Sequence, residues 1–293
     1  MTIHAQRHGR GTVSRRAALG LSALGAGALL SACGSPPTTD PAPSSPAPTA
    51  ASPEPDPAVI PQPDPSDPPR PRLPKFQRPQ ISRVPAPTGP FSALPGDGDL
   101  LAWTIDDGVS SEVVAAYAAF ASQTHARLTF FATGSYSSWS DNAETLRPLV
   151  QSGQVQIGNH TWTHPNLTEL SDRHVIDELQ RTHDRLGELF DVDARPFFRP
   201  PFGLYDDRVL AAAASIGYTA PTLWYGSLAD SGYQSRTRII ALAKQWFRPQ
   251  HIVIGHANFT PVTHAFGRLA RIIERRGLSP VTLNDVFTSA YHR

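Results

Sequence analysis

Proline is concentrated in one stretch of the chain, and this limits where a packed domain can form. Of the 30 prolines, 21 lie between Pro36 and Pro95. Proline fixes φ and lacks a backbone N–H, so a segment this rich in it cannot continue helices or sheets. Residues 34–95 also carry few apolar side chains, and we expect them to form a disordered, extended linker. About two hundred residues remain, enough for one domain over residues 96–293.

The segment before the linker has the order of an export signal. A basic pair is followed by a small-residue apolar run and then by Leu30-Ser31-Ala32-Cys33. The run is too short and too rich in glycine and alanine for a transmembrane helix. Arg15-Arg16 resembles a twin-arginine signal, and residues 30–33 resemble the lipobox of bacterial lipoproteins, whose cysteine is lipidated. The alternative is an ordinary secretory signal.

We therefore expect residues 1–33 to be a lipoprotein signal that leaves a lipid anchor on Cys33. The protein would then stay on the outer face of the bacterial cell membrane, with the linker as a spacer that reaches into the cell wall. A proline-rich ligand for an SH3-like module is the other reading of the linker.

The charge of the chain argues against several classes of partner. The formal net charge is +1, and removing the four arginines of the acid-free leader gives 1 − 4 = −3. So weak a net charge disfavours a nucleic-acid partner and electrostatic binding to a membrane. The lone cysteine, Cys33, excludes an internal disulfide and a cysteine-only metal cluster. We expect a monomer.

From residue 100 onward, short apolar runs alternate with amphipathic segments, which predicts an α/β fold with parallel strands. The expected strands are 100–105, 128–132, 154–157, 196–198, 218–224, 252–254 and 281–282. The expected helices are 113–122, 141–153, 171–190, 206–215, 235–247 and 262–276. This pattern suits either a barrel or a doubly wound sheet.

Reactive residues follow the predicted strands, and their positions favour the barrel. Each of these side chains comes just after the carboxyl end of a strand: Asp106, Asp107, His160, His164, Arg199, Asp230 and His256. The carboxyl ends of barrel strands converge on one mouth, whereas an open sheet would spread these side chains along an edge. We expect a distorted (β/α) barrel of about seven strands.

Two histidines and a carboxylate in these loops have the composition of a catalytic metal site. His160 and His164 lie in a polar loop, and neither is on an apolar helical face. Two imidazoles and one carboxylate leave positions on a divalent metal for water and substrate. Asp106 and Asp107 alone could also be a strand-end turn. A non-haem iron triad is a further alternative, but it generally lies on a β-sandwich, which the strand–helix alternation disfavours.

Five motifs together resemble the polysaccharide deacetylase (NodB homology) family, carbohydrate esterase family four. The resemblance covers about residues 97–293. In chain order the motifs are Thr104-Ile105-Asp106-Asp107-Gly108, similar to T-F-D-D-G; residues 128–134, similar to T-F-F-x-x-G; residues 160–164, similar to H-[ST]-x-x-H; residues 198–203, similar to R-x-P-[YF]; and residues 254–256, similar to L-x-H.

The resemblance implies metal-assisted attack of water on an acetyl carbonyl. It assigns Asp107, His160 and His164 as metal ligands, with Zn²⁺ expected and Co²⁺ or another divalent ion possible. It also assigns the catalytic groups: Asp106 as general base, His256 as general acid, Arg199 to orient Asp106, Asp230 to pair with His256, and a backbone N–H near Phe202 to stabilise the oxyanion. Phe202, Trp224 and Trp162 would contact substrate.

The fourth family motif, roughly W-x-x-D-x-x-D-W, is altered here. Trp224 and Asp230 remain, whereas Ser227 and Ser231 replace an acid and a tryptophan. Asn258 stands where an acid is frequent in the family. These changes leave the substrate open among peptidoglycan, chitin-like oligomers and acetylated xylan, and a surface tether favours peptidoglycan. A wall-associated carbohydrate-binding protein without catalysis is the other alternative.

Overall fold

The computed structural model describes residues 72–291, and the structural statements below concern that part of the chain. The predicted signal of residues 1–33, its Cys33 and most of the predicted linker lie outside the described residues. Within residues 72–291, no helix is both long enough and apolar enough to span a bilayer.

A parallel sheet forms the centre of the domain. Seven strands follow the order β6-β5-β4-β3-β2-β8-β7. An eighth strand, β9, lies outside this order and pairs with β2. The strands are β2 (Leu100–Asp107), β3 (Leu128–Ala132), β4 (Val155–Asn159), β5 (Phe197–Phe198), β6 (Ala220–Pro221), β7 (Gly226–Ser227), β8 (His251–His256) and β9 (Ser279–Pro280). The sheet curls, and the predicted distorted barrel of about seven strands is confirmed.

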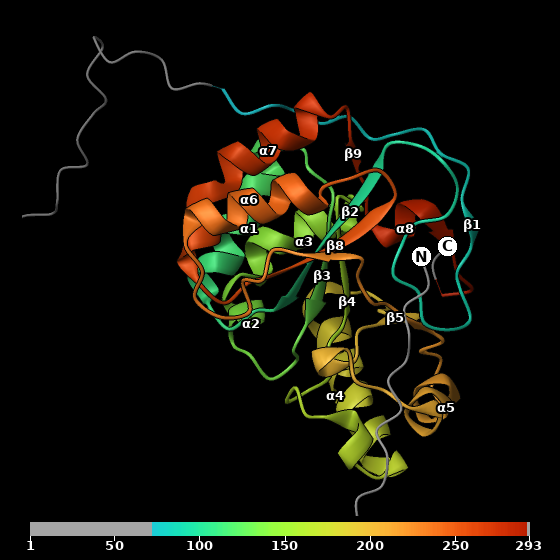
Figure 1. The fold of residues 1–293 in the computed structure, drawn as a ribbon. Helices are drawn as coiled ribbons and strands as arrows, with labels where there is room; N and C mark the ends of the chain where they lie inside the picture. Colours follow the sequence, from blue (N-terminus) through green and yellow to red (C-terminus); the bar gives the residue numbers. More distant parts are fainter. Residues whose placement is uncertain (1–71, 292–293) are drawn as a thin grey trace, which may run out of the picture. The chain divides into compact units, whose positions relative to one another are not determined.

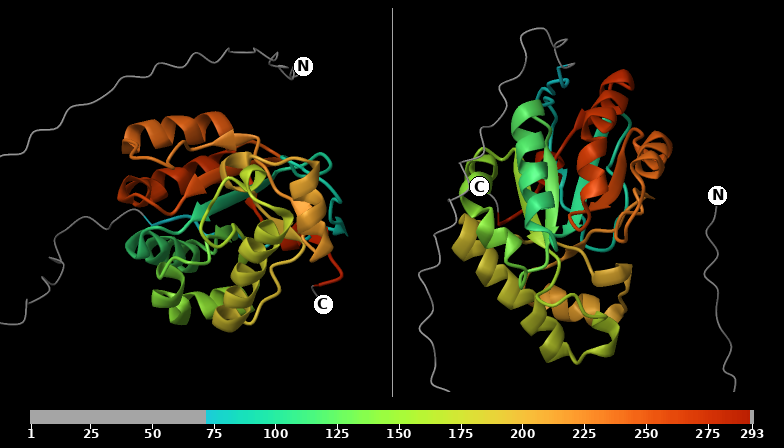
Figure 2. Two further views of the ribbon diagram at one scale, coloured as in Figure 1. Left: turned by 90° about the horizontal axis from the view of Figure 1, so that it is seen from below. Right: turned by 90° about the vertical axis from the view of Figure 1, so that its left-hand side faces the viewer.

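Helices cover the outside of the curled sheet (Figures 1 and 2). Helices α1 (Ser111–Thr124), α6 (Arg236–Trp246) and α7 (Phe266–Arg275) lie along one side. Helices α3 (Ala143–Gln151), α4 (Asp172–Phe190) and α5 (Asp207–Ser215) follow the other strands. The remaining short elements are α2 (Ser138–Asp141), α8 (Leu283–Val286), η1 (Leu167–Glu169), η2 (Pro201–Gly203) and η3 (Thr260–Ala265).

Side-chain caps explain where the long helices begin. Ser110, Ser171, Asp206 and Ser235 each accept a hydrogen bond from the backbone N–H three residues later. Such a cap satisfies one of the free N–H groups of the first turn. The predicted starts of α4, α5 and α6 therefore agree with the structure to within one residue.

Strand β2 divides its side chains between two hydrophobic clusters, as the two-residue period of a strand requires. Leu101 and Trp103 face the helices, where the Trp103 ring contacts Tyr117, Phe120, Phe247 and Phe266. Leu100 and Ala102 face the interior of the curled sheet. The interior face continues toward the carboxyl end of β2, where the reactive residues lie.

The prediction that the whole of residues 34–95 stays outside the fold is wrong for its last part. Strand β1 (Val84–Pro85) pairs with β10 (Phe287–Thr288), and Leu94 is buried. Phe91 packs on the interior cluster together with two further aromatic rings. Several of the few apolar residues of this arm meet the interior cluster, namely Ile81, Ala86, Phe91 and Leu94, which low average hydrophobicity does not reveal.

One predicted strand has different bounds for an identifiable reason. The sequence predicts a strand over residues 218–224, whereas the ladder with β5 covers only residues 220 and 221, as β6, and Thr222 forms an isolated bridge with Phe91. The carbonyls of Thr222 and Leu223 accept hydrogen bonds from the Arg199 guanidinium. They are therefore engaged by a side chain where a continuing strand would place them in a ladder.

Replacing Phe91 by alanine tests whether the arm is part of the domain. The ring lies 6.3 Å from that of Phe197 and 5.4 Å from that of Phe287. We expect Phe91→Ala to lower the free energy of unfolding by about 2–4 kcal/mol, measured by urea denaturation. Val84→Ala, at an exposed arm residue, should change it by less than about 0.5 kcal/mol. Equal effects of the two changes would mean that the arm does not contribute to the core.

Candidate active site

The two aspartates at the end of β2 face the same histidine because the backbone turns there. Neighbouring side chains of a strand point to opposite faces. Asp107 instead has a left-handed φ of 72°, followed by Gly108 with a φ of 94°. A Cβ on Gly108 would lie 2.4 Å from the Trp139 ring, so only glycine fits this position. The turn places carboxylate oxygens of Asp106 and Asp107 each 3.5 Å from Nε2 of His160.

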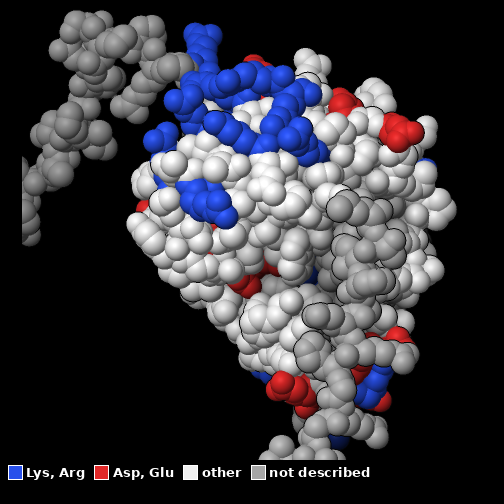
Figure 3. All heavy atoms as spheres, in the orientation of Figure 1, with Lys and Arg blue, Asp and Glu red and all other residues white. Residues whose placement is uncertain are grey.

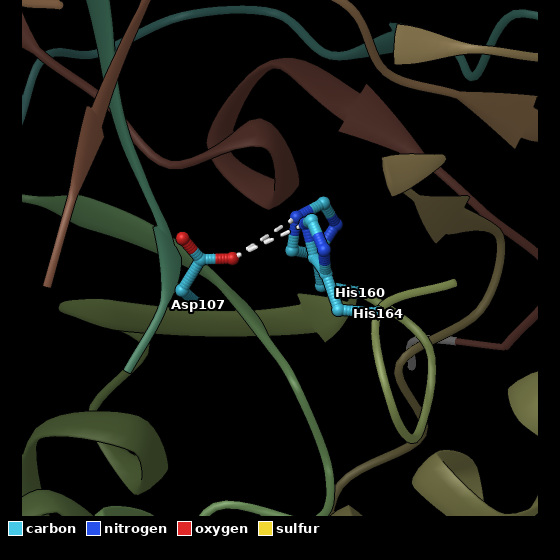
Figure 4. Close-up of side chains that lie close together, drawn as sticks. All are labelled: Asp107, His160 and His164. Carbon is cyan, nitrogen blue, oxygen red and sulfur yellow. Dashed lines mark ion pairs between the residues drawn. The ribbon is translucent and has the colours of Figure 1, made fainter. Parts of the chain in front are cut away.

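Asp107, His160 and His164 form a group that could hold a metal ion (Figure 4). One ligand atom from each residue lies within 4.8 Å of the others. Oδ1 of Asp107 is 3.5 Å from Nε2 of His160 and 3.4 Å from Nε2 of His164. The structure therefore brings together the three residues predicted as ligands. One oxygen and two imidazole nitrogens suit a catalytic divalent metal.

The orientation of His160 leaves the correct nitrogen for a metal. Its Nδ1 lies 2.7 Å from the carbonyl oxygen of Arg199. A carbonyl can only accept, so Nδ1 carries the hydrogen and Nε2 presents its lone pair to the group. Burial alone would lower the pKa of His160, but the charges of Asp106 and Asp107 outweigh it and raise this pKa. The same negative charges would attract a metal cation.

A fully buried arginine holds Asp106. The Arg199 guanidinium donates hydrogen bonds to Asp106 Oδ1 (2.5 Å), Thr104 Oγ1 (2.9 Å), Thr222 O (2.9 Å) and Leu223 O (3.1 Å). Burial lowers the pKa of Arg199, and the Asp106 carboxylate opposes this shift. A charged pair this deeply buried is retained only when its hydrogen-bonding groups are satisfied. The pairing predicted between Arg199 and Asp106 is present.

His256 and Asp230 form a second pair beside the aspartates. His256 is the last residue of β8, and Asp230 lies in the loop after β7. Nδ1 of His256 is 3.0 Å from Oδ1 of Asp230. Burial would lower the pKa of His256, but the hydrogen bond to Asp230 and the charge of Asp106 raise it above its ordinary value. The imidazole is thus favoured in its protonated form.

Asn258 fixes the second oxygen of Asp107. The Asn258 amide donates a 2.7 Å hydrogen bond to Oδ2 of Asp107 and accepts one from the N–H of Val109. Burial raises the pKa of Asp107, but its bonds with His160 and Asn258 bring it well below the usual range. The sequence marks Asn258 only as a departure from the family pattern. Its role as a donor to Asp107 depends on the fold.

Glu178 of α4 fixes the loop that carries the two histidines, and the sequence analysis missed it. Its carboxylate accepts hydrogen bonds from the N–H groups of Trp162 and Thr163 and from the Thr163 hydroxyl, at 2.7–2.8 Å. The buried residues of α4 include Val175, Glu178, Leu179 and Thr182, which share one face. A carboxylate on the buried face of an amphipathic helix is the sequence signal that could have found it.

Seven of the predicted site residues line one pocket, and Arg199 and Asp230 lie behind it, bound to Asp106 and His256. The pocket is formed by Asp106, Asp107, His160, His164, Pro200, Phe202, Trp224, Ser227, Ser231, Ile254 and His256. The Phe202 side chain is 62% exposed, and its ring lies 4.6 Å from that of His164. Trp162 does not line this pocket. It borders a separate hollow near Gly134, and Arg181 lies 4.5 Å above its ring.

Comparison with known proteins places the chain in a family. Residues 94–221 match the family model described as polysaccharide deacetylase. An uncharacterised protein of Streptomyces coelicolor is 30% identical over 187 residues, which are 62% of this chain and 70% of that protein. The chain belongs to the polysaccharide deacetylase family.

Other relatives show how much of this polysaccharide deacetylase family member resembles known proteins in fold and in sequence. A solved peptidoglycan N-acetylglucosamine deacetylase aligns with a TM-score of 0.62 at 21% identity, covering 70% of this chain and 96% of that one, and so shares its fold. The bifunctional xylanase/xylan deacetylase of Cellvibrio japonicus is 27% identical over 60% of this chain. The chain spans only 26% of that enzyme, and 33% and 20% of two other curated relatives.

A conservative change at Glu178 tests whether the histidine loop depends on it. We expect Glu178→Gln to weaken Zn²⁺ binding about tenfold, because a neutral amide oxygen makes weaker hydrogen bonds to the two backbone N–H groups than the charged carboxylate does. Isothermal titration of the metal-free protein measures the affinity. Asp177→Asn, at the exposed neighbouring position, is the matched control and should leave it unchanged. Unaltered affinity in Glu178→Gln would show that the loop holds its ligands without this carboxylate.

Proposed function

We propose that the chain is a metal-dependent hydrolase that removes acetyl groups from a polysaccharide. The observation that carries this proposal is the joint presence, in one pocket, of a candidate metal group, an arginine-bound carboxylate and a carboxylate-bound histidine. Structural metal sites need only the first of these. The other two supply a base and an acid, which hydrolysis of an amide or ester requires.

Asp107, His160 and His164 would hold the metal. The donor set fits Zn²⁺, because one carboxylate and two imidazoles with fixed orientations are typical of catalytic zinc sites. When bound, the metal would polarise the acetyl carbonyl and make water more acidic. The hydrogen bonds from Asn258 to Asp107 and from His160 to the Arg199 carbonyl hold two of the ligands in place.

Asp106 is the best-placed general base. Its Oδ1 is bound by Arg199, and its Oδ2 faces the metal group at 3.5 Å from Nε2 of His160. The free oxygen can therefore accept a proton from a water held in the pocket. Arg199 restricts the rotation of the carboxylate, so the accepting oxygen stays in position during the reaction. Asp106 thus acts on the attacking water, while Asp107 serves the metal.

His256 is the proton donor to the leaving group. Asp230 binds Nδ1 and raises the pKa of the imidazole, which favours the protonated form and leaves Nε2 free to donate. Departure of an amine or alkoxide needs this proton. The backbone near Phe202, where φ is 59°, lies at the pocket and is the candidate for stabilising the oxyanion.

Peptidoglycan is the substrate that we favour. Ser227 and Ser231 line the pocket beside Trp224. Two serines leave more open space than the acid and tryptophan of the usual fourth motif, which suits a branched, bulky glycan. A relative acts on xylan according to its name, so an O-acetyl xylan esterase is the second candidate. A glycan-binding protein without catalysis is less well supported, since base, acid and metal group are all in place.

We also propose that the protein is an exported lipoprotein anchored through Cys33 on the outer face of the cell membrane. The support is the sequence alone, with a twin-arginine-like pair before an apolar run and a lipobox-like end. The location would bring the pocket close to the wall of the same cell. Loss of membrane association in Cys33→Ser, measured by cell fractionation, would be the direct consequence.

Variants of Asp106 and His164 test the proposed division of roles. The wild-type protein with Zn²⁺ should release acetate from acetylated peptidoglycan fragments, measured by mass spectrometry of the fragments. Asp106→Asn should bind metal normally and lose activity by about a hundredfold or more, because it lacks the base. His164→Ala should lose both metal and activity. Equal loss of metal in the two variants would contradict the separate roles.

Parallel assays on other glycans test whether peptidoglycan is the preferred substrate. Acetylated xylan and chitin oligomers are assayed beside the peptidoglycan fragments with the same metal-loaded protein. Glycan binding without acetate release from any of them would favour the non-catalytic alternative and exclude the proposed activity. Faster release from xylan would keep the hydrolase and replace the substrate.

A further inference from the structure

The outer surfaces of α6 and α7 carry a concentration of positive charge. Residues 235–278 contain eight Lys or Arg side chains and one acidic side chain, Glu274. Six of the eight are exposed and two are half-buried. We call them the basic face: Arg236, Arg238, Lys244, Arg248, Arg268, Arg271, Arg275 and Arg276. Figure 3 shows basic side chains spread over the region where Figure 1 places α6 and α7.

The basic face is not neutralised by acidic neighbours. Within residues 72–291, none of its eight side chains forms an ion pair, whereas Arg181 and Arg185 of α4 pair with Asp177 and Glu188. Burial lowers the pKa of Arg276, and the nearby positive charge of Arg248 lowers it further. Repulsion between like charges that are held close together destabilises a folded protein. An anion bound to the basic face would reduce this repulsion.

The small net charge of the chain conceals this surface. Residues 96–234 contain 18 acidic and 8 basic side chains, so the excess of acid there cancels the basic face in the sum. Charges at opposite ends of a domain do not cancel locally, since salt screens them beyond about 10 Å. The expectation from net charge, that electrostatic membrane binding is disfavoured, therefore does not hold for this face.

We propose that the basic face docks on the anionic phospholipid headgroups of a membrane. Seven of its eight cations are arginines, whose planar guanidinium groups bind phosphate oxygens in pairs. None of them lines the pocket of the candidate active site. The large exposed apolar side chains of the described residues lie outside α6 and α7. The face therefore offers no aromatic platform for nucleic-acid bases, and its attraction would be electrostatic.

The route of the chain favours a membrane over a soluble polyanion as the partner of the basic face. Leu73 lies against Gly267 of α7, so the chain enters the domain beside the basic face, close to the exposed Arg72 and Lys75. Thirty-eight residues separate Arg72 from Cys33, the residue proposed to carry the lipid. A tether of that length keeps the domain near the headgroups, so that a weak attraction is enough. This part of the argument rests on the proposed lipid anchor.

Docking through the basic face would leave the pocket open. Helix α6 leads into the first residue of β8, and α7 leads into β9, which pairs with the first residues of β2. The ends of α6 and α7, with Lys244 and Arg275, thus lie at the amino ends of the strands. The candidate catalytic residues lie at the carboxyl ends, the opposite side of the sheet. Arg236, Arg238 and Arg268 lie in the first turns of the two helices, so the basic face runs along the side of the sheet. A domain docked on this side would keep the pocket, which none of these cations lines, off the membrane.

Vesicle binding by the full chain tests the proposal. The protein carries Cys33→Ser to prevent lipidation, and cosedimentation is measured with vesicles of phosphatidylcholine, with and without phosphatidylglycerol. Pure phosphatidylcholine measures the apolar contribution of the leader and tether. The four leader arginines are also attracted to phosphatidylglycerol, so the basic face is isolated by comparing triple variants that keep the same leader. We expect the anionic vesicles to bind far more tightly at about 0.05 M NaCl, with most of this preference lost at about 0.5 M. Arg238→Gln/Arg268→Gln/Arg275→Gln should weaken anionic binding by about a hundredfold.

The matched control is Arg173→Gln/Arg181→Gln/Arg185→Gln on α4, which removes the same charge and should keep the affinity within about threefold. Equal losses in the two triple variants would overturn the proposal, as would binding that does not depend on phosphatidylglycerol or salt. Tighter binding to soluble polyphosphate or DNA than to the vesicles would overturn the lipid assignment. None of the six substituted residues lines the pocket, so we expect both variants to release acetate from soluble fragments at the wild-type rate. Failure of docking is therefore separable from failure of the proposed activity.

Discussion

The left-handed turn at Asp107 is the constraint on which the rest of the site depends. Without it, β2 would direct its last two carboxylates to opposite faces of the sheet. With it, Asp106 and Asp107 both approach His160, and the two can take different roles. The turn also needs Gly108, because the Trp139 ring fills the space that a side chain would use. Backbone strain of this kind persists only where surrounding contacts enforce it.

The contacts that enforce this geometry are buried charges and their hydrogen bonds. Arg199 binds Asp106 and also two carbonyls of the chain after β6, so one guanidinium joins the base to the wall of the pocket. Asn258 holds Asp107 through a hydrogen bond to its Oδ2, and Glu178 holds the histidine loop by accepting hydrogen bonds from two of its backbone N–H groups. Removing one partner of a buried charged pair leaves the other unpaired, at a cost of about 3–5 kcal/mol. The site is therefore tied to the stability of the domain.

Sequence reasoning predicted most of the site because strand order and strand ends are encoded locally. The alternation of apolar runs was enough to place Asp106, His160 and His256 at one mouth of a barrel, and the structure brings them together. It failed where the outcome depends on partners distant in the chain. Glu178 lies in a helix that looks ordinary, Trp162 turns toward a separate hollow, and Phe91 lies in a proline-rich segment yet packs on the interior.

The domain thus carries a candidate catalytic pocket at one end of its sheet and a basic face over two helices that run toward the other end. The central claim is that Asp107, and not Asp106, joins the two histidines in holding a metal. The most direct test is anomalous X-ray diffraction at the zinc edge from crystals of the Zn²⁺-loaded protein. We predict one ion bonded to Asp107, His160 and His164 at roughly 2.0–2.2 Å. An ion bonded to Asp106 in place of Asp107, or bound away from these histidines, would contradict the account.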